Sequence, residues 1–252
     1  MSHVAAAPRI GCVKYLNARP LIHGWPGEVY FDHPATLCRM LADGELDVAF
    51  VSSFEFLRDP SYSIVDGVCV AADGPVFSVF IAHRDPVEVA DEITVDPNSR
   101  TSVNLLRCLL AERNLAARLV ERNAEAKLLI GDQAIRFRQQ HEADYAFWDL
   151  AAEWKGATGL PFVFALWLIR PETPTAATIA EQLRSLCRTN LAALDTVVAA
   201  QTDVAPEFCD RYFREHLRFT FGDTEKQGLL HFRALCEKHG LLPPNGALLR
   251  LI

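Results

Sequence analysis

The chain has 252 residues, half of them hydrophobic, and a formal net charge of −7 at pH 7. This length fits one large domain or two small ones, and the apolar content is ample for a packed core. The negative charge argues against general nucleic-acid binding, because that activity depends on Lys and Arg side chains that neutralise phosphates.

Features that the sequence lacks indicate its location and redox state. No apolar run reaches the length of a membrane-spanning helix, and the strongest candidate, residues 161–169, is too short. Residues 1–8 show neither the basic nor the apolar region of a secretory signal. The seven cysteines are scattered without a Cys-x-x-Cys spacing. We therefore expect a cytoplasmic protein without membrane contact, with buried free thiols and neither a disulfide framework nor a zinc site.

The first half of the chain alternates between apolar runs and polar turns. Residues 9–13 predict a strand that leads into a polar loop containing Pro20. The spacing of Leu and Met in 34–43 predicts a helix that ends at Gly44. This order indicates parallel strands, and residues 73–75 form a turn between two of the later ones. The further strands expected here are 29–31, 46–51, 68–72, 76–82 and 93–95.

The second half begins with another block of strands and helices and then becomes helical. Residues 96–99 supply turn and capping residues before a helix over 101–113. Strands are expected over 127–130, 144–148 and 162–169, with a helix between the first two that reaches about residue 140. The C-terminal region is predicted to be helical over 176–200, 206–217 and 223–239.

This order predicts an α/β fold of two lobes, one inserted into the other. The first lobe is expected to comprise residues 1–92 and 162–252, and the inserted lobe residues 93–161. Short hydrophilic joints near 85–92 and 156–159 would connect them. Ligands of open α/β sheets bind beyond the carboxyl ends of the strands, so we expect a ligand cleft between the lobes.

The start of the helix that follows residue 99 is the clearest candidate for anion binding. A helix N-terminus presents unpaired backbone N–H groups and a partial positive charge, and Thr101 and Ser102 add hydroxyl groups. Arg100 is either a bidentate partner for a carboxylate or a solvated surface side chain. The alternative for the whole segment is that Ser99 caps the helix and no ligand binds.

Two other polar segments also follow predicted strands. Ser52 and Ser53 follow the strand 46–51, and they either donate hydrogen bonds into a cleft or cap the next helix. Asn17 either offers a ligand an uncharged donor and acceptor or closes a local turn. The sequence pattern alone leaves these alternatives open.

Several well-known site motifs are absent from the sequence. It contains no GxGxxG, no GxxxxGK[ST] and no GxSxG, and its eight histidines show no HExxH spacing. Asp132 and Asp149 end later segments, but neither has a neighbouring carboxylate in the sequence, so an acid–base pair is not indicated. We expect no cofactor and no metal. One aromatic cluster is predicted to be core: Phe147, Trp148, Trp154, Phe162, Phe164 and Trp167.

A series of segments, in order, carries a family pattern. They read IGCVKYLNARPL at 10–21, DVAFVSSFE at 47–55, SV at 78–79, SRTSVNLL at 99–106, GDQA at 131–134 and DLAAEWKGATGLPFVFALW at 149–167, with GL at 228–229 and HGL at 239–241. Together they resemble the chorismate dehydratase family of the futalosine-dependent menaquinone pathway. Two residues depart from the pattern. Lys14 replaces a smaller polar residue and would change the charge of the pocket, and Phe56 replaces a tyrosine.

The resemblance implies a type II periplasmic-binding-protein-like fold that works as an enzyme without metal or cofactor. It implies a lyase that removes water from chorismate to give 3-[(1-carboxyvinyl)oxy]benzoate, the substrate's own enolpyruvyl carboxylate accepting the C3 proton. Asn17 would act at the reacting centre, and the protein would be a monomer or homodimer. The substrate-binding residues expected are Tyr15, Leu16, Ser52, Ser53, Ser78, Arg100, Thr101, Ser102 and Asp149.

Three other functions remain compatible with such a fold. A non-catalytic binding or sensory protein for a small carboxylic acid would have the same cleft. The dihydroxynaphthoate synthase of the same pathway shares the fold but resembles this chain less in the YLN and TGLPFVFA segments. An effector domain of a transcription regulator is the third, although no helix-turn-helix is indicated.

Overall fold

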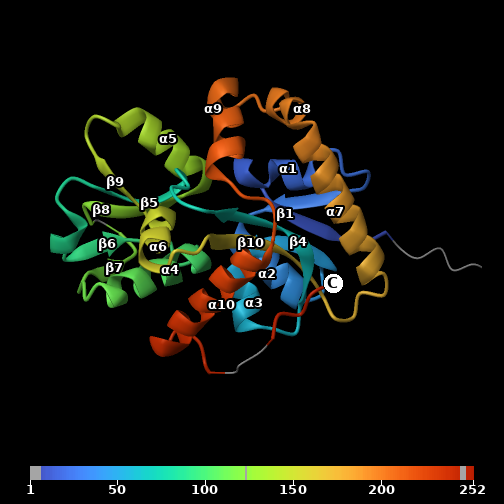
Figure 1. Cartoon of the computed structure of the whole chain (residues 1–252), viewed down its shortest axis with the longest axis horizontal. Coiled ribbons are helices and arrows are strands. Elements are labelled where there is room, and N and C mark those ends of the chain that lie inside the picture. Colours follow the sequence, from blue (N-terminus) through green and yellow to red (C-terminus); the bar gives the residue numbers. More distant parts are fainter. Residues whose placement is uncertain (1–6, 123, 245–247) are drawn as a thin grey trace, which may run out of the picture.

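The computed structural model describes residues 7–122, 124–244 and 248–252. Within these residues the strands form two five-stranded sheets, which occupy opposite halves of the molecule (Figure 1). The first sheet has the order β2-β1-β3-β10-β4. Its strands are β1 (Ile10–Val13), β2 (Val29–Asp32), β3 (Val48–Ser52), β4 (Ser63–Ala72) and β10 (Phe162–Ile169).

The second sheet repeats the pattern of the first in the order β7-β6-β8-β5-β9. Its strands are β5 (Val79–His83), β6 (Glu92–Thr94), β7 (Arg118–Val120), β8 (Ala126–Ile130) and β9 (Ala146–Asp149). In each sheet three strands pair in parallel, and one strand runs antiparallel to both of its neighbours. The antiparallel strands are β10 and β5. The parallel pairing predicted for the first three strands, β1, β2 and β3, is confirmed.

Helices cover both sheets and fill the C-terminal region. Those of the first half are the short η1 (Leu16–Ala18), α1 (Arg19–Ile22), α2 (Pro34–Ala42), α3 (Ser53–Arg58) and the short η2 (Val87–Val89). The inserted part holds α4 (Arg100–Glu112), α5 (Gly131–His141) and α6 (Leu150–Thr158). The C-terminal helices are α7 (Ala176–Ala192), α8 (Leu194–Ala199), α9 (Pro206–Arg211), η3 (Tyr212–His216) and α10 (Asp223–Lys238). The predicted helical C-terminal region is thus confirmed.

The chain crosses between the two sheets twice. The first crossing runs from β4 to β5, and the second runs from α6 to β10. The predicted boundary of the inserted lobe differs from the structure, because β5 pairs with β8 and β9 instead of joining the first sheet. The turn at 73–75, which resembles a hairpin in the sequence, is part of the first crossing. Residues 79–92 therefore belong with the inserted lobe.

The two lobes share one apolar core that reaches the crossings. Strand β10 has seven of its eight residues buried, which explains its continuous apolar sequence. Trp154 and Trp167 are fully buried, Phe162 and Phe164 nearly so, and Trp148 is also buried, so the predicted core role of these aromatic residues is confirmed. Phe147 is only partly buried against a smaller cluster.

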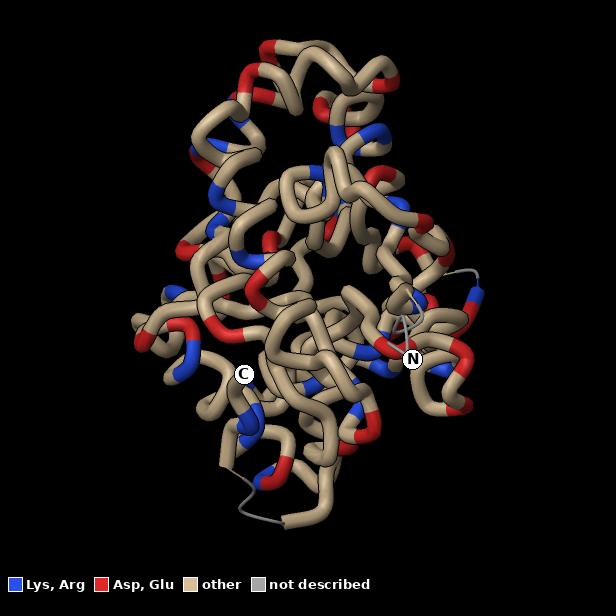
Figure 2. Tube along the Cα trace, turned by 90° about the vertical axis from the view of Figure 1, so that its right-hand side faces the viewer, with Lys and Arg blue, Asp and Glu red and all other residues tan. Residues whose placement is uncertain are grey.

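The cysteines are placed as the sequence predicts. All seven cysteines are buried and free. Acidic and basic positions are interspersed along the trace (Figure 2). In the described part of the chain, no helix combines the length and apolar character needed to cross a bilayer, and no group of three or more His, Cys, Asp or Glu side chains is placed to hold a metal ion.

Candidate functional site

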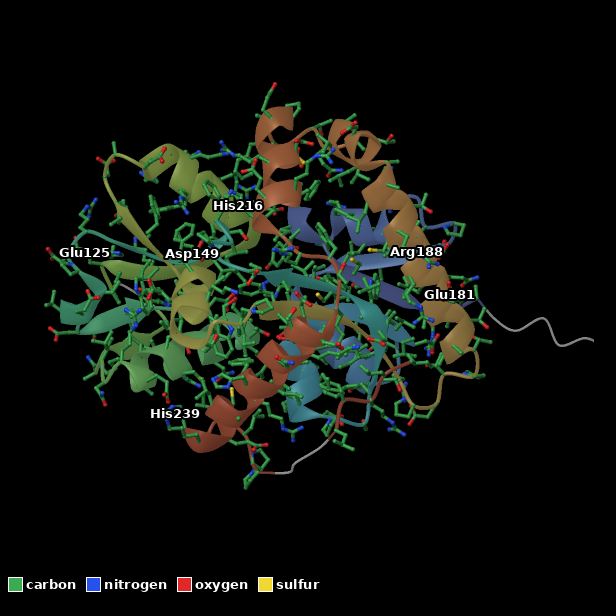
Figure 3. All side chains as sticks on the ribbon, in the orientation of Figure 1. Glu125, Asp149, Glu181, Arg188, His216 and His239 are labelled. Atoms are coloured by element: carbon green, nitrogen blue, oxygen red, sulfur yellow. The ribbon has the colours of Figure 1, made fainter. Side chains whose placement is uncertain are left out.

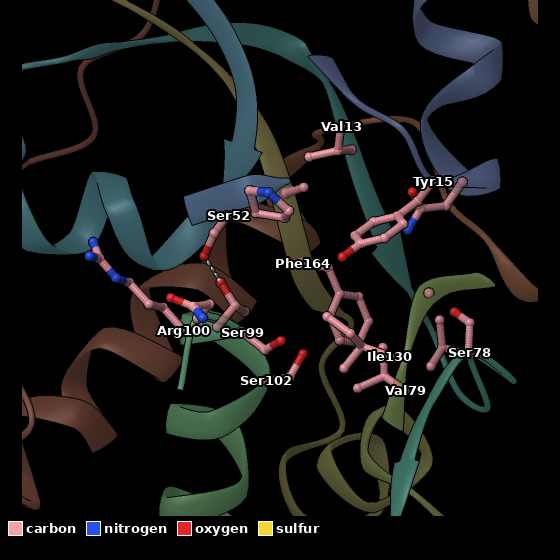
Figure 4. A pocket seen from close by; sticks show the side chains of 17 residues that line it. Val13, Tyr15, Ser52, Ser78, Val79, Ser99, Arg100, Ser102, Ile130 and Phe164 are labelled. Carbon is pink, nitrogen blue, oxygen red and sulfur yellow. Dashed lines mark hydrogen bonds between the residues drawn. The ribbon is translucent and has the colours of Figure 1, made fainter. Parts of the chain in front are cut away.

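A pocket lies at the junction of the two lobes (Figure 4). Its space, including the solvent at its mouth, measures about 610 Å³. The first lobe contributes residues that follow β1 and β3, together with β10, and the second lobe contributes the first crossing, the start of α4 and the end of β8. The predicted position of the ligand cleft is therefore correct.

The N-terminus of α4 points into this pocket. Ser99 stands at the N-cap position, but its hydroxyl makes no capping hydrogen bond, and the buried Oγ has no partner among the described residues. Thr101 and Ser102 are also buried, and both line the pocket together with Ser99 (Figure 4). The Ser99 side chain therefore does not cap the helix. An anion at this point would receive donors that the protein leaves free.

A hydroxyl pair connects the lobes at the same end of the pocket. Ser52, the last residue of β3, shares a short hydrogen bond with Thr101 of α4. Thr101 Oγ1 also accepts a hydrogen bond of 3.2 Å from the backbone N–H of Phe54. Ser53 faces away from the pocket, because its fully buried hydroxyl donates to the carbonyl of Val163 at 2.7 Å. Ser52 therefore lines the predicted site, and Ser53 supports it from behind.

Arg100 lines the pocket but directs its charge elsewhere. Its guanidinium pairs at 3.0 Å with the carboxylate of Glu55, which is fully buried and also pairs with Arg58. In Figure 4 the Arg100 side chain extends away from the open space. The prediction that this guanidinium binds substrate is thus wrong. Arg100 instead joins α4 to α3 across the lobes, because a buried carboxylate must be paired.

The segment after β1 forms the opposite wall. The backbone N–H of Leu16 donates to Asp132 Oδ1 at 2.9 Å, and the Leu16 side chain is buried in the core and does not line the pocket. Tyr15 and Asn17 do line it. The buried Asn17 Oδ1 has no hydrogen-bond partner in the described residues. An unpaired amide at the pocket wall is suited to a ligand hydroxyl, which can both accept and donate.

Tyr15 is held as a neutral donor at this wall. Burial, followed by the nearby charges of Asp132 and Asp96, raises the pKa of Tyr15 to about 12. Its ring packs against Gly131, which adopts φ +59° at the end of β8. A Cβ at Gly131 would lie only 3.0 Å from the ring, so glycine is required there by both conformation and space.

Ser78 lies on the first crossing and also lines the pocket. Ser78 is fully buried, and its backbone carbonyl accepts a hydrogen bond of 2.8 Å from the backbone N–H of Gly131. Its hydroxyl oxygen accepts a hydrogen bond of 2.7 Å from Tyr212. The structure thus brings Ser78 to the position predicted for a substrate contact.

Asp149, like Leu16 and Ser53, is a predicted substrate contact that the structure places outside the pocket lining. It caps α6 by accepting from the backbone N–H groups of Ala151 and Ala152. Asp149, labelled in Figure 3, also accepts from the backbone N–H groups of Val76 at 3.2 Å and Phe77 at 2.8 Å, which lie on the first crossing. Burial raises the pKa of Asp149 and these backbone N–H groups oppose that effect. Asp149 therefore ties the first crossing to the start of α6 and does not line the pocket.

Sequence reasoning missed part of the pocket lining, and it also misjudged Lys14. The missed residues are apolar or lie in a turn, types that give no chemical signal in a sequence: Val13, Pro34, Val76, Val79, Asn98, Ile130, Phe164 and Ala165. Lys14 is exposed and does not line the pocket. The prediction that it changes the charge of the pocket is therefore wrong.

The polar groups that line the pocket are mostly uncharged. Hydroxyl groups, an amide and the start of α4 supply uncharged donors, and the described lining includes no Asp, Glu or His side chain. Arg100 is paired with Glu55, a carboxylate that it shares with Arg58. Such a site can bind an anion without an opposing charge, but it offers no conventional general base.

Removing one hydroxyl tests the connection between the lobes. We expect Thr101→Val to lower the free energy of unfolding by about 1–3 kcal/mol, because the buried N–H of Phe54 loses its acceptor and Ser52 loses its partner. Urea denaturation measures the difference. The matched control is Thr189→Val on the exposed face of α7, which should stay within about 0.5 kcal/mol of the parent. Equal stabilities for both variants would contradict the assigned role of Thr101.

The fold and this pocket define a two-lobed α/β protein with a periplasmic-binding-protein-like fold. A protein of solved structure from Archaeoglobus fulgidus aligns with a TM-score of 0.75 at 16% identity, over 95% of this chain and all of that one. The alkanesulfonate-binding protein from Xanthomonas axonopodis pv. citri, bound to MOPS, aligns with a TM-score of 0.68 at 15% identity, over 97% of both chains. At these identities the likeness concerns the fold.

The sequence gives the family. The pattern that describes the menaquinone biosynthesis family matches residues 8–238, and this chain belongs to that family. It is 31% identical to a chorismate dehydratase from Thermus thermophilus over 92% of this chain and 95% of that protein. It is also 31% identical to a chorismate dehydratase from Campylobacter jejuni over 60% of this chain and 58% of that protein. The resemblance inferred from the sequence motifs is thereby confirmed.

Proposed function

We propose that this chain is a cytoplasmic chorismate dehydratase of menaquinone biosynthesis by the futalosine route. The observation that carries the proposal is a pocket of uncharged donors between two lobes, in a chain related over most of its length to a chorismate dehydratase. Chorismate carries two carboxylates and one hydroxyl, which suit the start of α4, the hydroxyl side chains and the Asn17 amide.

The reaction removes one proton and one hydroxyl from adjacent carbons. The C3–H bond breaks and its electrons form the new ring double bond, while the C4–O bond breaks and the oxygen leaves with the bonding electrons as hydroxide. The hydroxide takes up the proton removed from C3, so one water is lost and the ring becomes aromatic. Because the described lining includes no Asp, Glu or His side chain, the substrate's enolpyruvyl carboxylate is the proposed acceptor of the C3 proton. The protein's contribution is then to hold that carboxylate against C3, which is a problem of positioning.

Each wall of the pocket has a proposed task. The start of α4, with Thr101 and Ser102, holds one carboxylate together with Ser52. Ser78 and the neutral Tyr15 hydroxyl donate from the other side. The amide of Asn17 faces the leaving hydroxyl and stabilises the charge that develops on it. Burial of these groups between the lobes excludes water and strengthens each interaction.

The test uses purified protein and chorismate. We expect the protein to convert chorismate to a product that is lighter by one water. Chromatography and mass spectrometry detect this product. Heat-inactivated protein should give only the spontaneous rearrangement of chorismate. Stoichiometric binding of chorismate without conversion would instead support a non-catalytic binding protein. Light scattering after gel filtration measures the molar mass in solution, which distinguishes a monomer from a homodimer.

A further inference from the structure

Ser78 is unusual among the pocket hydroxyls because a buried phenol determines its hydrogen-bond direction. Tyr212 lies at the start of η3, far from Ser78 in the sequence, and its hydroxyl donates to Ser78 Oγ at 2.7 Å. Burial raises the pKa of Tyr212 well above its ordinary value, so the phenol keeps its proton and acts as a donor. The Tyr212 side chain does not line the pocket.

The position of Tyr212 is fixed by its neighbours. It is almost completely buried, and its ring stacks on that of Phe208 with centroids 5.7 Å apart and an angle of 13° between the ring planes. The backbone around Ser78 is fixed as well, because Asp149 accepts from the N–H of Phe77 and Gly131 donates to the Ser78 carbonyl. The hydroxyl-to-hydroxyl distance is therefore set by packing on both sides.

A serine hydroxyl has one proton and two lone pairs. With one lone pair occupied by Tyr212, the Ser78 proton must point elsewhere, and within the described residues no protein acceptor is placed to receive it. The remaining direction is the pocket, which Ser78 lines. A hydroxyl that accepts a hydrogen bond also becomes a stronger donor, because the two bonds polarise each other.

We infer that Tyr212 is a positioning residue, which orients the Ser78 hydroxyl as a donor to a carboxylate of the substrate. The inference rests on the proposed function, since it names a chorismate carboxylate as the acceptor. Tyr212 acts only through Ser78, so removal of its hydroxyl should matter when Ser78 is present and not otherwise.

A double-mutant cycle with Tyr212→Phe and Ser78→Ala tests this dependence. The readouts are equilibrium affinity for the reaction product, 3-[(1-carboxyvinyl)oxy]benzoate, by isothermal titration calorimetry, and kcat and KM for chorismate. We expect Tyr212→Phe to weaken product binding about five- to tenfold in the parent protein, because the Ser78 hydroxyl is no longer oriented and its charge-assisted hydrogen bond to the carboxylate weakens. In the Ser78→Ala background the same change should weaken binding less than twofold.

Tyr62→Phe is the matched control, because Tyr62 is also buried but lies outside the pocket lining. It should leave product affinity unchanged, and melting curves show whether each variant is folded. Equal losses from Tyr212→Phe with and without Ser78 would make Tyr212 a packing residue and overturn the inference, as would no loss in the parent. Should Tyr212→Phe not fold, replacement of Tyr212 by 3-fluorotyrosine gives a more acidic donor of nearly the same size, and unchanged product affinity would overturn the inference.

The outcomes also separate this inference from the proposed function. A parent protein that neither converts chorismate nor binds the product contradicts both. A parent protein that does both, with no coupling in the cycle, contradicts only the role of Tyr212.

Discussion

Asn17→Asp is expected to reduce kcat for chorismate about 100-fold or more while leaving the protein folded. The change is nearly isosteric, but it replaces an amide by a carboxylate at the pocket wall, where the substrate itself is doubly negative. The donor N–H is lost, and the new charge repels the hydroxyl oxygen as its C–O bond breaks. The buried Asn17 Oδ1 has no partner in the described protein, so the substitution breaks no hydrogen bond at that atom.

Steady-state kinetics and thermal melting measure the two effects separately. The matched control is Gln140→Glu, the same amide-to-carboxylate change on the exposed surface of α5, which should leave kcat and KM unaltered. If Asn17→Asp turned over chorismate at the parent rate, Asn17 would have no part in the reaction.

The arrangement of the two lobes followed from local sequence pattern to a large extent. Strand β10 and helix α10 were predictable because their apolar residues recur with the periods of a buried strand and an amphipathic helix. The sheet to which β5 belongs was not predictable. Its apolar sequence is equally suited to either sheet, and its pairing with β8 and β9 depends on residues far along the chain.

The site was predictable where a polar residue follows a strand or begins a helix, as with Ser52 and Thr101. It was not predictable where a long-range partner decides what a side chain does. Arg100 has the positive charge expected of a residue that binds a carboxylate. Its guanidinium, however, pairs with the buried Glu55 and is directed away from the pocket. Asp149 likewise satisfies backbone N–H groups of the first crossing, which no local pattern reveals.

Gly228→Ala is expected to destabilise the protein by about 2–3 kcal/mol, the cost of forcing an extra group into a packed site. Gly228 lies on α10 against the backbone of Pro161, just before β10, and an added Cβ would overlap the Pro161 carbonyl oxygen. That oxygen already accepts a hydrogen bond of 3.2 Å from the Trp154 indole. The Pro161 carbonyl is fixed by this hydrogen bond and by the chain on either side, so it cannot move aside. Helix α10 itself must therefore move away from the second crossing.

Gly156→Ala provides the matched comparison for this effect, because both residues are glycines within helices. Gly156 is exposed on α6, and a Cβ there would meet no atom within 4 Å. Alanine at Gly156 should therefore stabilise the helix by about 0.5–1 kcal/mol through its smaller loss of backbone entropy. Thermal melting should show opposite shifts, a decrease of roughly 5–10 °C for Gly228→Ala and a small increase for Gly156→Ala. A Gly228→Ala protein as stable as its parent would mean that α10 is not packed directly on Pro161. In that case the second crossing would lack the rigid support on which the geometry of the pocket depends.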